Sequence, residues 1–226
     1  MQGFGRRLQR YRVVLLGACG IVCIAASAFG AGPGAADDRP VVLFLGDSLT
    51  AGYGLAAEQA FPALIQRRID AAGLDYRVMN AGVSGDTSAG GLRRVDWLLQ
   101  QPIAILVLEL GANDMLRGQS VESMRSNLRG ILEKVRAAQP DVRFVIAGMR
   151  AAPNLGPAYG REYEETFPLI ASEYDATLIP FVLDGVAGDA ALTQPDGIHP
   201  TALGYERVAI VVWDALAPLL RPEAGP

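Results

Sequence analysis

The sequence predicts an α/β domain in which helices cover both faces of a mainly parallel β-sheet. Short apolar runs alternate along the chain with longer segments whose apolar residues recur at helical spacing, the pattern of repeated βαβ units. The runs are continuously apolar, as expected of strands that are buried on both faces. Half of the 226 residues are hydrophobic. This amount is ample for one core, and we expect a single domain over residues 39–221.

Five segments are predicted as strands. The first stops at the residue before Gly46, and the third is the most hydrophobic and is therefore expected at the centre of the sheet. The five are Val41–Leu45, Tyr76–Met79, Ile103–Leu108, Val142–Ala147 and Thr177–Ile179.

Helices are predicted between these strands from apolar residues at spacings of three and four. Gly73 is a candidate C-cap for the first helix, and Ser120 is a candidate N-cap for the third. The proline- and glycine-rich segment Ala151–Pro157 is predicted to lack regular structure. The helices are expected over residues 58–72, around Leu92–Leu99, and over Val121–Val135, Glu162–Tyr174 and Leu203–Leu220.

Residues 1–28 are interpreted as a secretory signal peptide whose boundary can extend to about residue 36. Four arginines up to Arg12 precede an uncharged stretch that is apolar to about Phe29, and Ala26–Ala28 has the small residues of a cleavage site. We therefore expect a periplasmic or secreted protein. An uncleaved membrane anchor is the alternative, because about 17 apolar residues are just enough to span a bilayer. Arg6-Arg7 is also compatible with twin-arginine export.

Cleavage would change the chemistry of the remaining chain. Both cysteines, Cys19 and Cys23, lie in the segment to be removed, so the mature domain would have neither a disulfide nor a thiol. Leu16–Cys19 has only a faint similarity to a lipoprotein site. The loss of four arginines would change the formal charge from −4 to −8. Because no basic run follows Arg12, we expect no nucleic-acid partner, and no stable membrane insertion after processing.

Ser48 is the candidate nucleophile. It lies two residues beyond Gly46, where open parallel sheets bind their ligands, outside the carboxyl end of a strand. A serine hydroxyl is a weak nucleophile that needs a base within hydrogen-bond reach and a third group to orient that base. The chain has one histidine, His199, so only this residue can supply an imidazole base.

Asp196 is the candidate orienting group. It lies three residues before His199 in a loop that Pro195 opens, and a carboxylate there can accept the Nδ1 proton and leave Nε2 free to face Ser48. Asp86 and Asp184 are alternative partners for His199. Ser84 is an alternative nucleophile, because Gly82–Gly85 is close to a G-x-S-x-G elbow, but Asp86 occupies the position of the last glycine.

An oxyanion needs hydrogen-bond donors that are in place before the reaction starts. Three candidates follow three strands whose ends should lie at one edge of the sheet: the backbone N–H groups of Ser48 and Gly82, and the side-chain amide of Asn113. Asp47 and Asp114 are interpreted as structural residues of these loops. No ligand cluster has zinc spacing, so we expect no metal.

These blocks resemble the SGNH, or GDSL-type, hydrolase superfamily over essentially the whole mature chain. The similar segments are Gly46–Leu49, Asn80–Thr87, Gly111–Asp114 and Asp196–Pro200. Ser84–Ser88, Leu108–Gly111, Leu116–Gly118 and Asn154–Pro157 look like the arylesterase, acyl-CoA thioesterase I and lysophospholipase L1 branch. Ala112 is a departure, since some relatives have a second glycine there.

The resemblance implies a flavodoxin-like three-layer α/β/α sandwich with a mainly parallel five-stranded sheet. It also implies hydrolysis of esters or thioesters of acyl chains without a cofactor, on small-molecule substrates, with an acyl-binding segment after Met149. Two other functions stay open: a carbohydrate deacetylase on the same fold, and a catalytically silent domain that binds a small ligand. Acyl-chain length, leaving group and oligomeric state are not specified by the sequence.

Overall fold

A computed structural model describes residues 37–221. The predicted signal peptide and both cysteines fall on residues 1–36, outside this part of the chain. None of the helices between residues 37 and 221 has both the length and the apolar character needed to cross a bilayer.

The centre of the fold is a five-stranded sheet in which all neighbouring strands are parallel. The strand order is β2-β1-β3-β4-β5, the doubly wound order of flavodoxin-like folds, so the predicted fold class is confirmed. The strands are β1 Val41–Gly46, β2 Arg77–Gly82, β3 Ile103–Glu109, β4 Arg143–Ala147 and β5 Thr177–Ile179.

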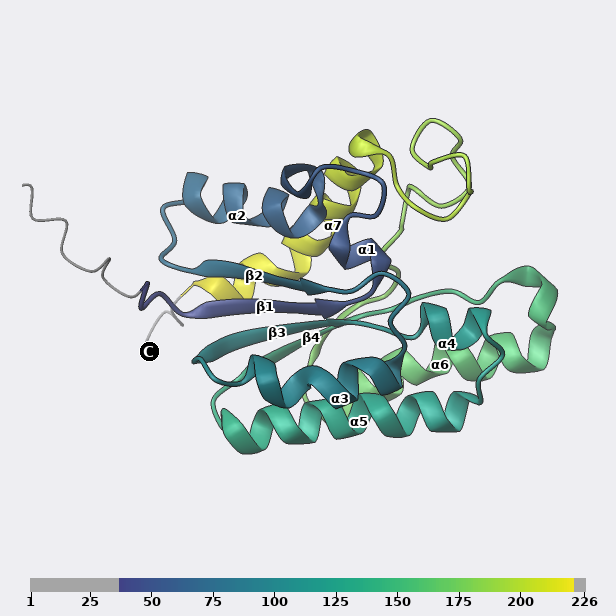
Figure 1. The fold of residues 1–226 in the computed structure, drawn as a ribbon, viewed down its shortest axis with the longest axis horizontal. Helices are drawn as coiled ribbons and strands as arrows, with labels where there is room; N and C mark the ends of the chain where they lie inside the picture. Colours follow the sequence, from purple (N-terminus) through teal and green to yellow (C-terminus); the bar gives the residue numbers. More distant parts are fainter. Residues whose placement is uncertain (1–36, 222–226) are drawn as a thin grey trace, which may run out of the picture. The chain divides into compact units, whose positions relative to one another are not determined.

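Helices cover both faces of this sheet (Figure 1). α2 and α7 pack on one face, and α3, α5 and α6 pack on the other. The two remaining α-helices, α1 and α4, are short and follow directly on strands. The bounds are α1 Ser48–Ala51, α2 Phe61–Ala71, α3 Ser88–Leu98, α4 Ala112–Leu116, α5 Val121–Ala138, α6 Pro157–Glu173 and α7 Ala202–Leu220, with 3-10 turns at Ala57–Gln59 and Pro153–Leu155.

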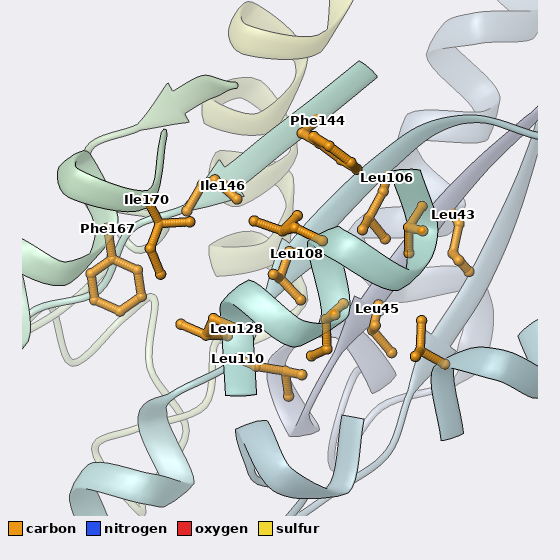
Figure 2. Packing of buried hydrophobic residues seen from close by; sticks show 14 of the residues in the cluster. Leu43, Leu45, Leu106, Leu108, Leu110, Leu128, Phe144, Ile146, Phe167 and Ile170 are labelled. Carbon is orange, nitrogen blue, oxygen red and sulfur yellow. The ribbon is translucent and has the colours of Figure 1, made fainter. Parts of the chain in front are cut away.

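Each central strand contributes side chains to two hydrophobic cores, one on each face of the sheet. Along β1, Leu43 and Leu45 enter the core under α3 and α5, whereas Val42 and Phe44 enter the core under α2 and α7. Figure 2 shows the first of these cores, where leucines from β1 and β3 pack beside Leu128 of α5. A strand between two cores must be apolar at every position, which is why the strands were recognisable as unbroken apolar runs.

Several boundaries differ from prediction. β2 continues to Gly82 instead of ending at Met79, because each of its residues pairs in register with β1. α6 begins at Pro157, five residues earlier than predicted, because proline is well accommodated at the first position of a helix. Ser120 is confirmed as an N-cap, since it accepts a hydrogen bond from the Ser123 N–H. The C-cap of α2 is Ala72, and Gly73, at φ +67°, is the next residue, so the predicted cap is one position too late.

The strand order places the candidate site residues at one edge of the sheet. From β1 the chain moves outward to β2 and then returns past β1 to β3, so the strand order reverses between β1 and β3. Loops diverge at such a point and leave a crevice at the carboxyl edge of the sheet. Ser48 and Asn113 follow β1 and β3 at this edge, and Gly82 is the last residue of β2. All three lie close to the loop that joins β5 to α7 (Figure 1).

Candidate active site

Ser48 is the first residue of α1, immediately beyond β1. The Asp47 carboxylate caps this helix by accepting a hydrogen bond from the Leu49 N–H at 3.0 Å. The cap forces an abrupt change from strand to helix, and this change leaves the Ser48 side chain half-buried between its buried neighbours Asp47 and Leu49. Within residues 37–221, no hydrogen bond occupies the Ser48 N–H.

His199 reaches Ser48 from the loop between β5 and α7. Its Nε2 lies 2.9 Å from Ser48 Oγ, and its Nδ1 lies 2.6 Å from Asp196 Oδ2. The three side chains are separated by up to 151 positions in the sequence, and they form one continuous hydrogen-bonded chain. The histidine side chain is 14% exposed and the aspartate side chain 37%.

The loop is built to hold this geometry. Asp196 Oδ1 accepts hydrogen bonds from the N–H groups of Ile198 and His199, while Oδ2 bonds to the imidazole. Gly197, at φ +71°, makes the tight turn that the three-residue spacing requires. The backbone and imidazole hydrogen bonds from His199, with that from Ile198, lower the pKa of Asp196 to about 2, so it is a carboxylate at neutral pH.

Tyr53 is a contact that the sequence did not predict. Its ring lies against the His199 imidazole, with centroids 4.5 Å apart and an interplanar angle of 37°. Gln194 connects the same two segments, since its side-chain amide donates to the carbonyls of Tyr53 and Pro200. The imidazole is therefore held both by Asp196 and by an aromatic face from the segment after α1.

Two of the three candidate oxyanion donors already have partners. Asn113 Nδ2 donates to Asp47 Oδ2 at 3.0 Å, which orients the amide and leaves its second hydrogen for a substrate. The Gly82 N–H donates to Asn80 Oδ1 at 2.9 Å. A substrate must share or displace that bond, so Gly82 is a less prepared donor than Ser48 or Asn113.

Gly82 is needed for a close approach between backbones. A Cβ at this position would lie 2.3 Å from the Ala51 nitrogen and 2.7 Å from the Thr50 carbonyl carbon. Asn80 fastens the same contact, since its amide donates to the Thr50 carbonyl. The absence of a side chain at residue 82 thus lets the end of β2 pack directly against α1, which carries Ser48.

The alternative assignments of nucleophile and partner find no support in the geometry. Among the described residues it is Ser48, and not the exposed Ser84, that contacts His199. Asp86 is engaged in an ion pair with Arg94 at 2.7 Å. Asp184 lines a cavity and makes no hydrogen bond to His199.

Asp114 has a structural role, as the sequence indicated. It is fully buried and accepts hydrogen bonds from the Ser88 N–H and hydroxyl at 2.8 and 2.5 Å. Asn127 of α5 bonds in turn to the Ser88 hydroxyl. This network ties the start of α3 to α4, the helix that carries Asn113.

A mainly apolar cavity of about 490 Å³ opens beside the site, a size typical of small-molecule pockets. It is bounded by neighbours of the site residues: Leu49, Ala112 and Ile198. Met149 and Ala151–Pro153, from the segment after β4, also line it, together with Phe181–Leu183 from the loop after β5. Within residues 37–221, no group of acidic, histidine or cysteine side chains is arranged to hold a metal ion.

The comparisons with known proteins agree with this architecture. The sequence model of the GDSL-like lipase/acylhydrolase family matches residues 44–207. Esterase TesA of Pseudomonas aeruginosa is 41% identical over 180 residues, which cover 79% of this chain and 89% of that protein. Thioesterase 1/protease 1/lysophospholipase L1 of Escherichia coli K12 is 37% identical over 185 residues, 81% of this chain and 86% of that protein.

Solved structures give the same result. A crystal structure of TesA superimposes with a TM-score of 0.75 at 40% identity, over 79% of this chain and 99% of that chain. The psychrotrophic esterase EstA from Pseudoalteromonas, inhibited by monoethylphosphonate, gives 0.75 at 35% identity, over 80% and 99%. AlinE4, a SGNH-hydrolase family esterase, gives 0.66 at 42% identity, over 81% and 98%. By family match, identity and fold, the chain belongs to the GDSL-like lipase/acylhydrolase family.

Proposed function

We propose that this protein is an esterase that hydrolyses carboxylic esters or thioesters of acyl chains through a covalent acyl-enzyme on Ser48. The observation that carries the proposal is the 2.9 Å contact between His199 Nε2 and Ser48 Oγ beside an apolar cavity. The names of the relatives, which include an esterase, a thioesterase/lysophospholipase and an arylesterase, support the same class of reaction.

The first half of the reaction forms the acyl-enzyme. Ser48 Oγ attacks the acyl carbonyl carbon while His199 Nε2 takes the hydroxyl proton. Asp196, charged and bonded to Nδ1, stabilises the imidazolium that results. The negative charge on the former carbonyl oxygen is stabilised by the Ser48 N–H and by the free hydrogen of the Asn113 amide, with the Gly82 N–H as a third donor. His199 then gives its proton to the leaving alcohol or thiol as the bond to the acyl carbon breaks.

The second half releases the acid. A water molecule gives a proton to His199 and attacks the acyl carbon, and the second tetrahedral intermediate forms at the same donors. As it breaks down, Ser48 Oγ leaves and recovers the proton from His199, and the carboxylic acid departs. Protons balance at each step, and no further group is required.

The cavity supports an acyl chain as the recognised part of the substrate. Its lining is mainly apolar, and each methylene buried in such a lining contributes about 0.8 kcal/mol, or roughly a fourfold gain in kcat/KM. We expect kcat/KM for p-nitrophenyl esters to rise with chain length from acetate until the cavity is filled. A panel extended to palmitate, to acyl-CoA and to lysophospholipid would identify the leaving group that is preferred.

The decisive test is Ser48→Ala with p-nitrophenyl butyrate, beside labelling of the native protein with an organophosphonate. We expect the variant to lose turnover and the phosphonate to add to Ser48, as located by peptide mass spectrometry. Undiminished turnover by Ser48→Ala would overturn the assignment of the nucleophile. A native protein that neither turns over ester nor accepts phosphonate would be a binding domain instead of an enzyme.

We propose in addition that the enzyme acts outside the cytoplasm, in the periplasm or in the medium. The support is the sequence of residues 1–28, with its arginines, apolar stretch and small-residue exit. Cell fractionation followed by N-terminal sequencing tests this proposal. A mature protein that begins near residue 29 would support it, and an intact N-terminus in the membrane fraction would favour the anchor.

A further inference from the structure

Two carboxyl groups are buried directly beneath the nucleophile. Asp47 at the end of β1 is 1% exposed and Glu109 at the end of β3 is 0% exposed. In the described part of the chain, neither carboxyl forms an ion pair with a lysine or arginine. The nearby guanidinium of Arg94 bonds to the Gly46 carbonyl and to Asp86 instead. Two adjacent buried charges without a cation are very unfavourable.

The hydrogen bonds differ sharply between the oxygen atoms of the pair. Glu109 Oε2 accepts three hydrogen bonds: from the Asp47 N–H at 3.3 Å, the Thr50 N–H at 3.2 Å and the Thr50 hydroxyl at 2.7 Å. Glu109 Oε1 is buried and has no partner with a hydrogen to donate. An oxygen in that position is satisfied if it carries a proton itself and donates it.

Asp47 is the acceptor that such a proton needs. Its Oδ1 accepts from the Leu49 N–H and its Oδ2 from Asn113 Nδ2, both at 3.0 Å. Burial and the neighbouring charge of Asp47 raise the pKa of Glu109 well above its ordinary value. Burial raises the pKa of Asp47 to about 6, although hydrogen bonds, one of them to the Glu109 side chain, oppose the shift. Of the two, Glu109 is therefore the group that keeps its proton.

We propose that Glu109 is a protonated positioning residue, whose O–H donates to Asp47 and so holds the Asp47 carboxylate in place to orient the oxyanion-binding amide of Asn113. The role rests on the proposed function, since it acts on a donor for the tetrahedral intermediate. Gly46 leaves the space for the pair, because a Cβ there would lie 2.6 Å from Glu109 Oε2. Glu109 itself touches no reacting atom.

The tyrosines that face the two carboxyls do not supply a positive charge that would allow both of them to ionise. Tyr163 of α6 and Tyr205 of α7 face both carboxyls, and burial raises the pKa of each phenol further above its ordinary value. Both phenols are therefore neutral. His199 also acts on Asp47: burial raises the pKa of that carboxyl, and the charge of His199 opposes the rise.

The test compares Glu109→Gln and Glu109→Leu, with Glu165→Gln as a matched control on the exposed face of α6. Glutamine has the shape of protonated glutamate: its oxygen can accept the Thr50 bonds and its N–H₂ can donate to Asp47. We expect kcat for p-nitrophenyl butyrate within about threefold of wild type for Glu109→Gln, as for the control. We expect Glu109→Leu to lower kcat by about 30-fold or more while KM changes little, because a transition-state donor loses its orientation.

A second measurement locates the proton without reference to activity. A group whose pKa is raised on folding binds its proton more strongly in the folded state, so its contribution to stability falls as pH rises from the unfolded value through the folded value. Glutamine cannot lose a proton. The free energy of unfolding is measured in urea for both proteins. The difference between Glu109→Gln and wild type should shift in favour of the variant as pH rises above about 4.5, because only the wild type loses stability through this group.

Three results would overturn the proposal. One is a folded Glu109→Gln with kcat reduced as much as in Glu109→Leu, which would mean that a charged glutamate is needed. Another is a stability difference that does not grow with pH, and a third is wild-type kcat in Glu109→Leu. If the native protein is not labelled at Ser48, the positioning role fails together with the proposed function, and the urea comparison still decides where the proton lies.

Discussion

Replacing Asp196 with asparagine tests the hydrogen-bonded chain at its outer end. The carboxylate has three partners: two backbone N–H groups on Oδ1 and the imidazole on Oδ2. Asparagine has one acceptor oxygen, so it keeps either the two backbone bonds or the one imidazole bond. Because a hydrogen bond to a backbone donor contributes about 0.5–1.5 kcal/mol, the orientation that keeps both is favoured. In that orientation the amide nitrogen faces His199 Nδ1.

This orientation disables the base. An N–H₂ group opposite Nδ1 stabilises the tautomer in which Nδ1 accepts and Nε2 carries the proton, and such an imidazole cannot take the proton of Ser48. The same error in a buried triad lowers kcat about 10⁴-fold. The Asp196 side chain is 37% exposed, so water can partly replace it. We therefore expect a loss of about 10³-fold, or roughly 4 kcal/mol of transition-state stabilisation.

The assay is kcat for p-nitrophenyl butyrate, with circular dichroism to confirm the fold and Asp175→Asn as a control. Asp175 is exposed and has φ +51°, a conformation that asparagine tolerates well, so this control should behave as wild type. Because the pKa of Asp196 is about 2, the wild-type side chain is a carboxylate at every assay pH above about 4, so its own titration does not affect the comparison. A folded Asp196→Asn that keeps a tenth or more of the wild-type kcat would refute the reasoning.

Three other changes should have separable effects. Asn113→Ala should lower kcat by about 10²–10³-fold with little change in KM, since it removes a donor used in the transition state; an unchanged kcat would exclude the amide from the oxyanion site. Gly82→Ala should lower stability by about 1–3 kcal/mol, seen as a fall in Tm, because its Cβ would overlap the backbone of Ala51; an unchanged Tm would contradict this packing. Leu183→Glu should reduce activity on long-chain esters more than on acetate, because Leu183 lines the cavity and a buried charge there disfavours an acyl chain. The control Leu169→Glu, at an exposed position of α6, should reduce activity on neither ester. Equal losses in the two variants would argue against this cavity as the acyl site.

The sequence predicted the regular elements well because local rules dominate there. Every strand buried between two cores was recognisable as an apolar run, and the long helices showed their apolar stripes. The α-helices that were not predicted are α1 and α4, with four and five residues, and the 3-10 turn Pro153–Leu155 lies in a segment that was expected to lack regular structure. A helix that short completes hardly more than one turn and has no periodicity to detect. The Asp47 cap stabilises α1, and the hydrogen bonds from Ser88 to Asp114 fasten α4.

Some residues of the candidate site were predicted from the sequence and others were not. Ser48, His199 and Asp196 were selected because few residues could fill each role, above all because the chain has a single histidine. Asn80 and Glu109 were not selected. Asn80 was one of several polar residues in a loop. Glu109 follows directly on the predicted strand Ile103–Leu108, and only the structure shows that it is the last, buried residue of β3.

The sequence alone determined which chemistry is possible: one serine, one imidazole and one carboxylate at loop positions, separated by segments that alternate between strand and helix. It determined this because hydrophobic periodicity and residue type are local properties. Only the tertiary structure decided that Ser48 Oγ and His199 Nε2 lie 2.9 Å apart, that the Gly82 N–H is already engaged by Asn80, and that Glu109 lies against Asp47 with no ion pair to a lysine or arginine of residues 37–221. These features depend on strand order and on burial, and both arise from contacts between residues that are distant in the chain.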